Sequence, residues 1–257
     1  MPRVNNVKKS RTIIPGHILH KTSDGSWQTR KPGLNSKRVK QDPMFLLARQ
    51  NANEFGHAVR TGKMIRCAFY DFFNKANRST LASRLLKQII QALRADTRNV
   101  RGQRTLLDGA PEMLEGFQFN EKQPLHKVMS MPFILQLNKN KTKFTACFPS
   151  FDPLMMIRPQ SKITYFRLVA TCGYINMEKG TYGIDAARTG FLPYNKQKTE
   201  IIELSCKVAR GKGYLNFLAI GIDFFYQEDQ VFCPAIGSAA DALSIVKVLR
   251  QSPNFKT

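Results

Sequence analysis

Residues 214–226 have the sequence YLNFLAIGIDFFY, one of six strand-like runs in the second half of the chain. The segment Arg210-Gly211-Lys212-Gly213 before it has the composition of a hairpin turn. The other five runs are separated by breakers such as Asp152-Pro153, and they lie at Phe133–Leu137, Lys143–Phe148, Ile163–Tyr174, Glu200–Val208 and Leu243–Leu249. Many short strands with turn signals between them predict an antiparallel β-sandwich or barrel over residues 112–257. The last run also fits a helical period over Ala239–Val248, so a short helix remains an alternative there.

Residues 42–111 are predicted to be a helical region. Asp42-Pro43 supplies a helix cap and a first-turn proline. Apolar residues then recur at spacings of three and four, at Phe45, Ala48, Ala52, Phe55 and Val59. Gly62 is a candidate interruption before the apolar segment Met64–Phe73.

A further helix is predicted after Ser79, a candidate cap. Its apolar side chains form one stripe: Leu81, Leu85, Leu86, Ile89, Ile90 and Leu93. Gly102, Gly109 and Pro111 mark the exit from this region.

Residues 1–41 form a basic arm, with ten Lys and Arg against one acidic residue, Asp24. Asp24-Gly25 lies between two extended runs and predicts a β-hairpin too poor in apolar residues to be stable alone. The predicted fold class is therefore α+β: a basic N-terminal arm with a β-hairpin, a helical region, and a C-terminal antiparallel β-sandwich.

The net charge of the chain is +22, from 40 Lys and Arg against 18 Asp and Glu. Residues 1–110 hold 22 basic and 6 acidic groups, whereas residues 111–257 hold 18 and 12. A fold does not require such an excess, and self-repulsion opposes it, so the charge indicates a polyanionic partner.

The strongest candidate site is a row on the predicted helix after Ser79. Its members follow one another at spacings of 3, 4, 3, 4 and 3: Arg84, Lys87, Gln91, Arg94, Arg98 and Arg101. If the helix runs that far, these side chains share one face over about 25 Å, which suits successive phosphates. No Asp or Glu lies between Asp71 and Asp96, although an ordinary solvated face is the alternative.

The arm supplies the second group of candidate nucleic-acid contacts. Its basic members are Lys21, Arg30, Lys31, Lys37, Arg38 and Lys40. Trp27, the only Trp of the chain, lies beside them on the predicted hairpin. An aromatic ring among cations is typical of single-strand binding, where the ring stacks on a base. Anchoring of the hairpin by Trp27 is the alternative.

Catalytic and metal-binding patterns are missing from the sequence. The five Cys are isolated from one another and are expected to be reduced, buried thiols. His17, His20, His57 and His126 have no neighbours at metal-ligand spacing. No GxSxG elbow or phosphate-binding glycine loop is present, so neither a catalytic residue, a metal nor a cofactor is expected. We expect no membrane span and a cytoplasmic location, with virion association as a compatible alternative.

Several segments resemble an uncharacterised family of basic proteins from Bacteroidota. They are Arg38–Lys63, Arg101-Gly102-Gln103-Arg104, Leu114–Asn120 and Ala219–Phe225. The resemblance implies a basic hairpin, then helices, then a β-rich domain, and it carries no function.

Two functions follow from these patterns, and an enzyme whose site no motif reveals is kept as a third hypothesis. The first is a non-enzymatic nucleic-acid-binding protein that contacts the phosphates of DNA or RNA, or another polyanion, with low sequence specificity. The alternative is a structural assembly protein of a virion or other large particle, in which the basic arm contacts neighbouring subunits or packaged nucleic acid. The expected division is an arm over 1–41, a helical region over 42–111 and a sandwich over 112–257.

Overall fold

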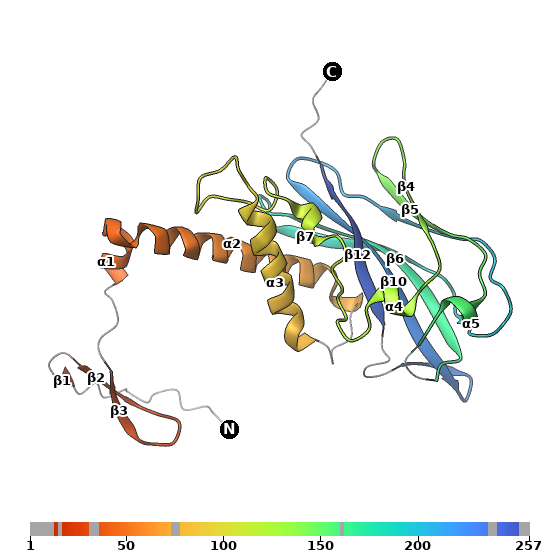
Figure 1. The fold of residues 1–257 in the computed structure, drawn as a ribbon, viewed down its shortest axis with the longest axis horizontal. Helices are drawn as coiled ribbons and strands as arrows, with labels where there is room; N and C mark the ends of the chain where they lie inside the picture. Colours follow the sequence, from red (N-terminus) through yellow and green to blue (C-terminus); the bar gives the residue numbers. More distant parts are fainter. Residues whose placement is uncertain are drawn as a thin grey trace, which may run out of the picture. The chain divides into compact units, whose positions relative to one another are not determined.

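The computed structural model describes residues 13–14, 17–30, 36–72, 78–159, 162–235 and 241–251. It is a mixed α+β structure in which a helical region precedes antiparallel sheets (Figure 1). The contacts divide the chain into two compact units, residues 1–49 and 50–257, and each unit is described by itself.

The first unit contains the predicted hairpin. Strands β1 (Ile13–Ile14), β2 (His17–Lys21) and β3 (Trp27–Arg30) pair in that order, all antiparallel. Gly25 takes a positive φ of 87° in the turn between β2 and β3, so the hairpin prediction is confirmed. Helix α1 (Ser36–Gln41) leads to the 3-10 turn η1 (Pro43–Phe45), where Asp42 accepts a hydrogen bond from the Met44 backbone N–H at 2.9 Å. The predicted cap is therefore present.

Helix α2 (Leu46–Ala68) is longer than the sequence predicts. It continues through Gly62, so the predicted interruption is wrong. Because Gly62 is buried and faces the Ile89 side chain, packing offsets its low helix propensity. The buried face also differs from the predicted apolar stripe, and it comprises Glu54, Ala58, Thr61, Gly62, Ile65 and Ala68.

Helix α3 (Arg78–Arg94) buries the predicted stripe. Leu81, Leu85 and Ile89 are almost fully inaccessible. They belong to one core with α2 and with one face of the main sheet. The ring of Phe69 presses on β6 at Gly173, where a Cβ would lie only 2.4 Å from the ring. That close approach explains why glycine occupies this strand position.

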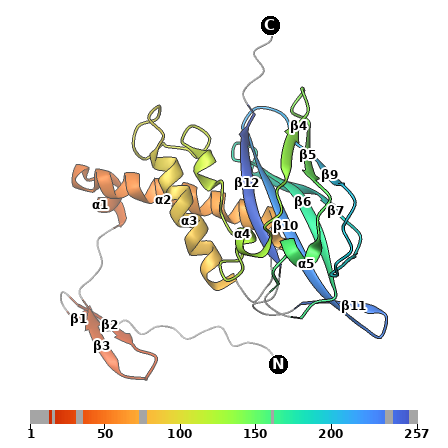
Figure 2. The ribbon, with the colours of Figure 1, turned by 45° about the vertical axis from the view of Figure 1, so that its right-hand side comes forward.

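Two antiparallel sheets follow the helices, and one curls into a half-barrel (Figure 2). The six-stranded sheet contains β6 (Tyr165–Asn176), β7 (Thr181–Arg188), β8 (Leu192–Pro193), β10 (Tyr214–Glu228), β11 (Val231–Pro234) and β12 (Ala242–Arg250). The three-stranded sheet contains β4 (Ile134–Leu137), β5 (Lys143–Phe148) and β9 (Ile202–Lys207). All six predicted runs are strands, which excludes the helical alternative for the last one. Strands β7, β8 and β11 were not predicted.

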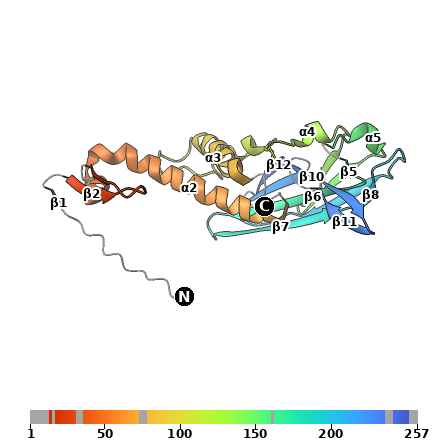
Figure 3. The ribbon, with the colours of Figure 1, turned by 90° about the horizontal axis from the view of Figure 1, so that it is seen from below.

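The central strands β6 and β10 of the six-stranded sheet are buried on both faces. Along β10, Leu215, Phe217 and Ala219 face the core shared with the helices. Their neighbours Leu218 and Ile220 face the core shared with the three-stranded sheet. The sheet therefore lies between the helices and the smaller sheet. Two short helices, α4 (Leu125–Val128) and α5 (Pro153–Met156), contribute Leu125, Val128 and Met156 to the core shared with the smaller sheet, and Figure 3 shows these elements from below.

One predicted turn is wrong. Residues 210–213 join β9 to β10, which belong to different sheets and do not pair, so this segment is a crossing between layers and not a hairpin. Gly211 and Gly213 both have positive φ, which explains the turn-like composition. Among the helices of the described ranges, none has both the length and the hydropathy needed to cross a bilayer.

Candidate nucleic-acid interface

The predicted basic row is only partly helical. Arg84, Lys87, Gln91 and Arg94 lie on α3, which ends at Arg94. Arg98 and Arg101 lie in the following loop, so the predicted extension of the row along one helix to residue 101 is wrong. The loop begins where Asp96 accepts backbone hydrogen bonds, a role that competes with continued helix.

The Arg84 side chain points inward, and other residues of the protein accept hydrogen bonds from its guanidinium. Its Nη1 and Nη2 donate to the backbone carbonyls of Gln118 and Phe119 at 2.8 and 3.2 Å. Its Nε lies 3.1 Å from the Glu121 carboxylate, and its guanidinium lies over the Phe117 ring. These contacts tie the segment 117–121 to α3, and they leave this arginine little capacity for an external phosphate.

Lys87 and Arg94 have the opposite environment. Both side chains are exposed on α3. Neither forms an ion pair or a hydrogen bond with any other residue that the structure describes. Their charges are therefore not compensated by a neighbouring carboxylate among the described residues. A contact with a phosphate requires such uncompensated charge.

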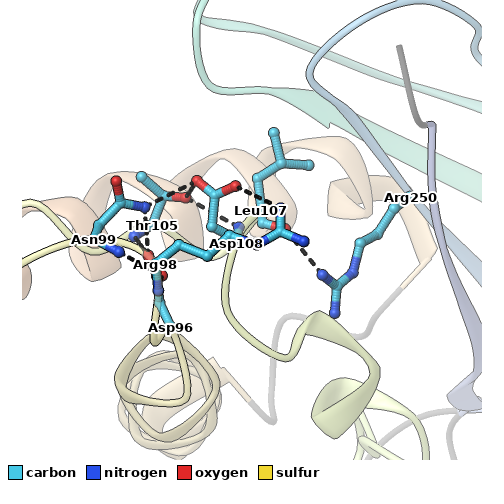
Figure 4. Close-up of polar contacts among 7 residues, drawn as sticks. All are labelled: Asp96, Arg98, Asn99, Thr105, Leu107, Asp108 and Arg250. Atoms are coloured by element: carbon cyan, nitrogen blue, oxygen red, sulfur yellow. Dashed lines mark hydrogen bonds and ion pairs between the residues drawn. The ribbon is translucent and has the colours of Figure 1, made fainter. Parts of the chain in front are cut away.

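The loop after α3 is organised around the buried carboxylate of Asp96 (Figure 4). Asp96 accepts from the backbone N–H groups of Arg98, Asn99 and Thr105 at 2.9, 3.1 and 3.0 Å. The Asn99 side-chain amide adds a fourth bond at 2.8 Å. Burial opposes ionisation of Asp96, but these hydrogen bonds outweigh it and lower the pKa of the carboxyl group.

This loop presents two further arginines. The Arg98 side chain is 80% exposed, and its closest carboxylate, Asp108, is 4.0 Å away. Arg101 is also exposed, and its Nη2 donates to the side-chain carbonyl of Asn51 at 2.8 Å, which positions the guanidinium without neutralising it. Together Lys87, Arg94, Arg98 and Arg101 form what we term the α3 basic surface.

Two hollows adjoin this surface. One, of about 440 Å³, lies between α3 and residues 116–121 and includes Arg84, Lys87 and Gln91 in its wall. The other, of about 420 Å³, lies between α2 and α3 and includes Phe55 and Arg94.

The arm residues lie in the first unit. The Trp27 side chain on β3 is 59% exposed, as stacking on a base would require. Lys21 and Arg30 lie on β2 and β3, where they pair in register with Trp27 and Ile18. On α1, Lys37, Arg38 and Lys40 are exposed, and Arg38 pairs with Asp42 at 3.2 Å. Lys31 lies outside the described residues.

No group of three His, Cys, Asp or Glu that could hold a metal ion occurs among the residues described. All five Cys are free, as predicted, but only Cys172 and Cys206 are buried. The predicted burial is wrong for the other three, Cys67, Cys147 and Cys233, which are partly exposed. Burial raises the pKa of the Cys172 and Cys206 thiols to about 12 and about 11, so both are poor nucleophiles at neutral pH.

A cluster of partly buried charges on the main sheet was not predicted. Arg167 on β6 donates to the Asp223 carboxylate on β10 at 2.7 Å. Asp241 precedes β12, and burial together with the charge of Asp223 raises the pKa of Asp241 to about 7. These residues are far apart in sequence, so no motif spacing could have indicated that strand pairing brings them together.

The exposed ring of Phe55 was also missed as a site residue. The sequence reading placed Phe55 in the apolar stripe of its helix, whereas its side chain is 53% exposed. The signal that could have revealed this is the second series on α2, Glu54, Ala58, Thr61 and Ile65, which has the same helical spacing but two polar members.

Comparison with known proteins adds no assignment, since no protein-family model, no curated protein and no solved structure matches this chain.

Proposed function

We propose that this protein binds nucleic acid without catalysing a reaction, through phosphate contacts of low sequence specificity. The observation that carries the proposal is the α3 basic surface, on which Lys87 and Arg94 are exposed and unpaired and Arg98 and Arg101 are held by the Asp96 loop. Four uncompensated or weakly compensated cations in a chain of net charge +22 favour a polyanion.

The arm supports the same proposal. Lys37, Arg38 and Lys40 place three cations on one short helix, and Trp27 adds an exposed ring in the same unit. Arg84 is left out of the proposed contacts because the protein itself uses its donors.

The test is the salt dependence of binding to a blunt-ended DNA duplex and to oligo(dT). Four phosphate contacts predict a log–log slope of about −3.6 on duplex DNA, and arm contacts would steepen it. A flat dependence between low and physiological ionic strength would show that phosphates are not the ligand.

A second candidate function, subunit assembly of a virion or other large particle, is favoured by strand β4. This strand pairs only with β5 among the described strands, and Ile134 and Leu137 on it are 62% and 37% exposed. An exposed apolar edge strand is suited to pairing with another chain. The proposed β-sandwich over residues 112–257, supported by the apolar core between the two sheets, would supply such contacts.

Size-exclusion chromatography with and without nuclease separates the two functions. A large species that shrinks after nuclease treatment supports nucleic-acid binding. An oligomer that resists nuclease supports assembly.

A further inference from the structure

The groove between α2 and α3 combines an apolar lining with an exposed aromatic ring. Its apolar wall is formed by Ala52, Phe55, Ile90 and Leu93, and its volume is about 420 Å³. That volume lies within the range of roughly 300–1,000 Å³ that is usual for small-molecule sites. The Phe55 side chain is 53% exposed, so one part of the ring remains open to a ligand.

The polar residues of the groove are arranged to leave positive charge at its surface. Glu54 is its only acid, but this side chain is buried, accepts from the Gly102 backbone N–H at 2.9 Å, and lies 3.9 Å from Arg104. Gly102 reaches Glu54 with a φ of 90°, a conformation that favours glycine. The carboxylate is thus compensated inside the protein.

The cations of the groove remain at the surface. Arg94 is exposed and has no ion pair among the described residues. Arg101 is placed beside the groove by its hydrogen bond to Asn51, which lines it. A purely apolar partner would gain nothing from these two guanidiniums, whereas an anionic ligand with a flat apolar face would use both features.

We propose that this groove binds an unpaired base of single-stranded nucleic acid, stacked on Phe55, with the adjoining phosphates on Arg94 and Arg101. The proposal rests on the proposed function and specifies its substrate as single-stranded. In a duplex the faces of the bases are already stacked on their neighbours, so the Phe55 ring has no partner there. Stacking on Phe55 therefore favours a single strand over a duplex.

The first test measures binding of the full-length chain to oligo(dT) and to a blunt-ended two-stranded DNA duplex, which has no unpaired loop. Phe55→Ala is expected to weaken oligo(dT) binding about 5- to 150-fold, the range measured for loss of one stacked base, and to leave the duplex affinity unchanged. Val59→Ala, on the same helix and also exposed, is the matched control and is expected to change neither. Lys87→Ala/Arg94→Ala is expected to weaken both probes.

The second test reads the contact directly by fluorescence. Because Trp27 is the only Trp, a Trp27→Phe/Phe55→Trp variant carries one reporter in the groove. Oligo(dT) is expected to quench this indole, and the blunt-ended duplex is not. Far-UV circular dichroism of each variant confirms that the fold is retained.

The outcomes distinguish the proposed stacking site from the proposed function on which it rests. If Lys87→Ala/Arg94→Ala weakens both probes but Phe55→Ala changes neither, or changes both equally, the stacking site is overturned while the proposed function stands. If the unaltered protein binds neither probe, both are overturned. Binding of an acidic amphipathic peptide is measured as well. If Phe55→Ala loses this binding but keeps oligo(dT) binding, the groove binds a protein partner and the proposal is overturned.

Discussion

Arg84 and the pair Lys87 and Arg94 lie on the same helix, yet their environments predict opposite effects on binding and stability. Lys87→Ala/Arg94→Ala removes two exposed, unpaired cations. At about −0.9 per phosphate contact, the log–log salt slope on duplex DNA should become shallower by about 1.8, and on a single strand by about 1.4. The free energy of unfolding should change by less than about 0.5 kcal/mol, because neither side chain forms an ion pair or a hydrogen bond with a described residue.

Arg84→Ala also removes a positive charge but should act on the fold. It deletes two hydrogen bonds from a charged donor to backbone carbonyls, at 2.8 and 3.2 Å, and one ion pair with a largely exposed Glu121. The expected loss is about 2–4 kcal/mol of unfolding free energy, measured by urea denaturation, with an unchanged salt slope for the folded fraction. An equal change of slope in Arg84→Ala and in either single variant, Lys87→Ala or Arg94→Ala, would refute this division of roles.

Three further predictions concern other parts of the molecule. Trp27→Ala should weaken oligo(dT) binding about 5- to 150-fold with unchanged stability, because the ring is exposed; unchanged oligo(dT) affinity would exclude stacking there. The folded pKa of Asp241, about 7, lies above its unfolded value of 3.8, so the folded state binds more protons between these values and stability falls as pH rises through this window. Asp241→Asn should therefore raise the unfolding free energy by about 1–2 kcal/mol at pH 8 and leave it unchanged at pH 3, and an equal gain at both pH values would contradict the assignment. Gly173→Ala would place a Cβ 2.4 Å from the Phe69 ring and should cost about 1–3 kcal/mol in urea denaturation, whereas Gly190→Ala, with open space around it, should be nearly neutral.

The strands of the second half of the chain could be predicted from the sequence because they are apolar and are separated by residues that break strands, such as Gly and Pro. Every run predicted there is a strand, and the leucine stripe of α3 is buried as its spacing indicates. Strand β7 was missed because residues 181–188 lie at the sheet surface, where few apolar side chains are needed. The connection 210–213 was misread because glycine at positive φ serves a crossing between sheets as well as a hairpin.

The candidate site was less predictable because charge alone does not show which way a side chain points. Arg84 and Lys87 look alike in sequence, but segment 117–121 returns to cover the first and leaves the second exposed. On α2, the apolar series containing Phe55 and the mixed series containing Glu54 have the same period. Tertiary partners supplied by Gly102 and Arg104 determine that the mixed series is buried.

Strand β10 contributes alternate side chains to two hydrophobic cores, so neither core can open without disturbing the other. Residues 50–257 are therefore expected to lose their structure in a single cooperative transition despite containing helices and two sheets. The backbone amides of β10 should exchange with solvent more slowly than those of the edge strand β4, at rates that approach the limit set by global unfolding. Because β10 also pairs with β6, whose paired residues lie 38 to 60 positions earlier in the chain, this strand joins the native structure only after a large loop has closed, which predicts slow folding.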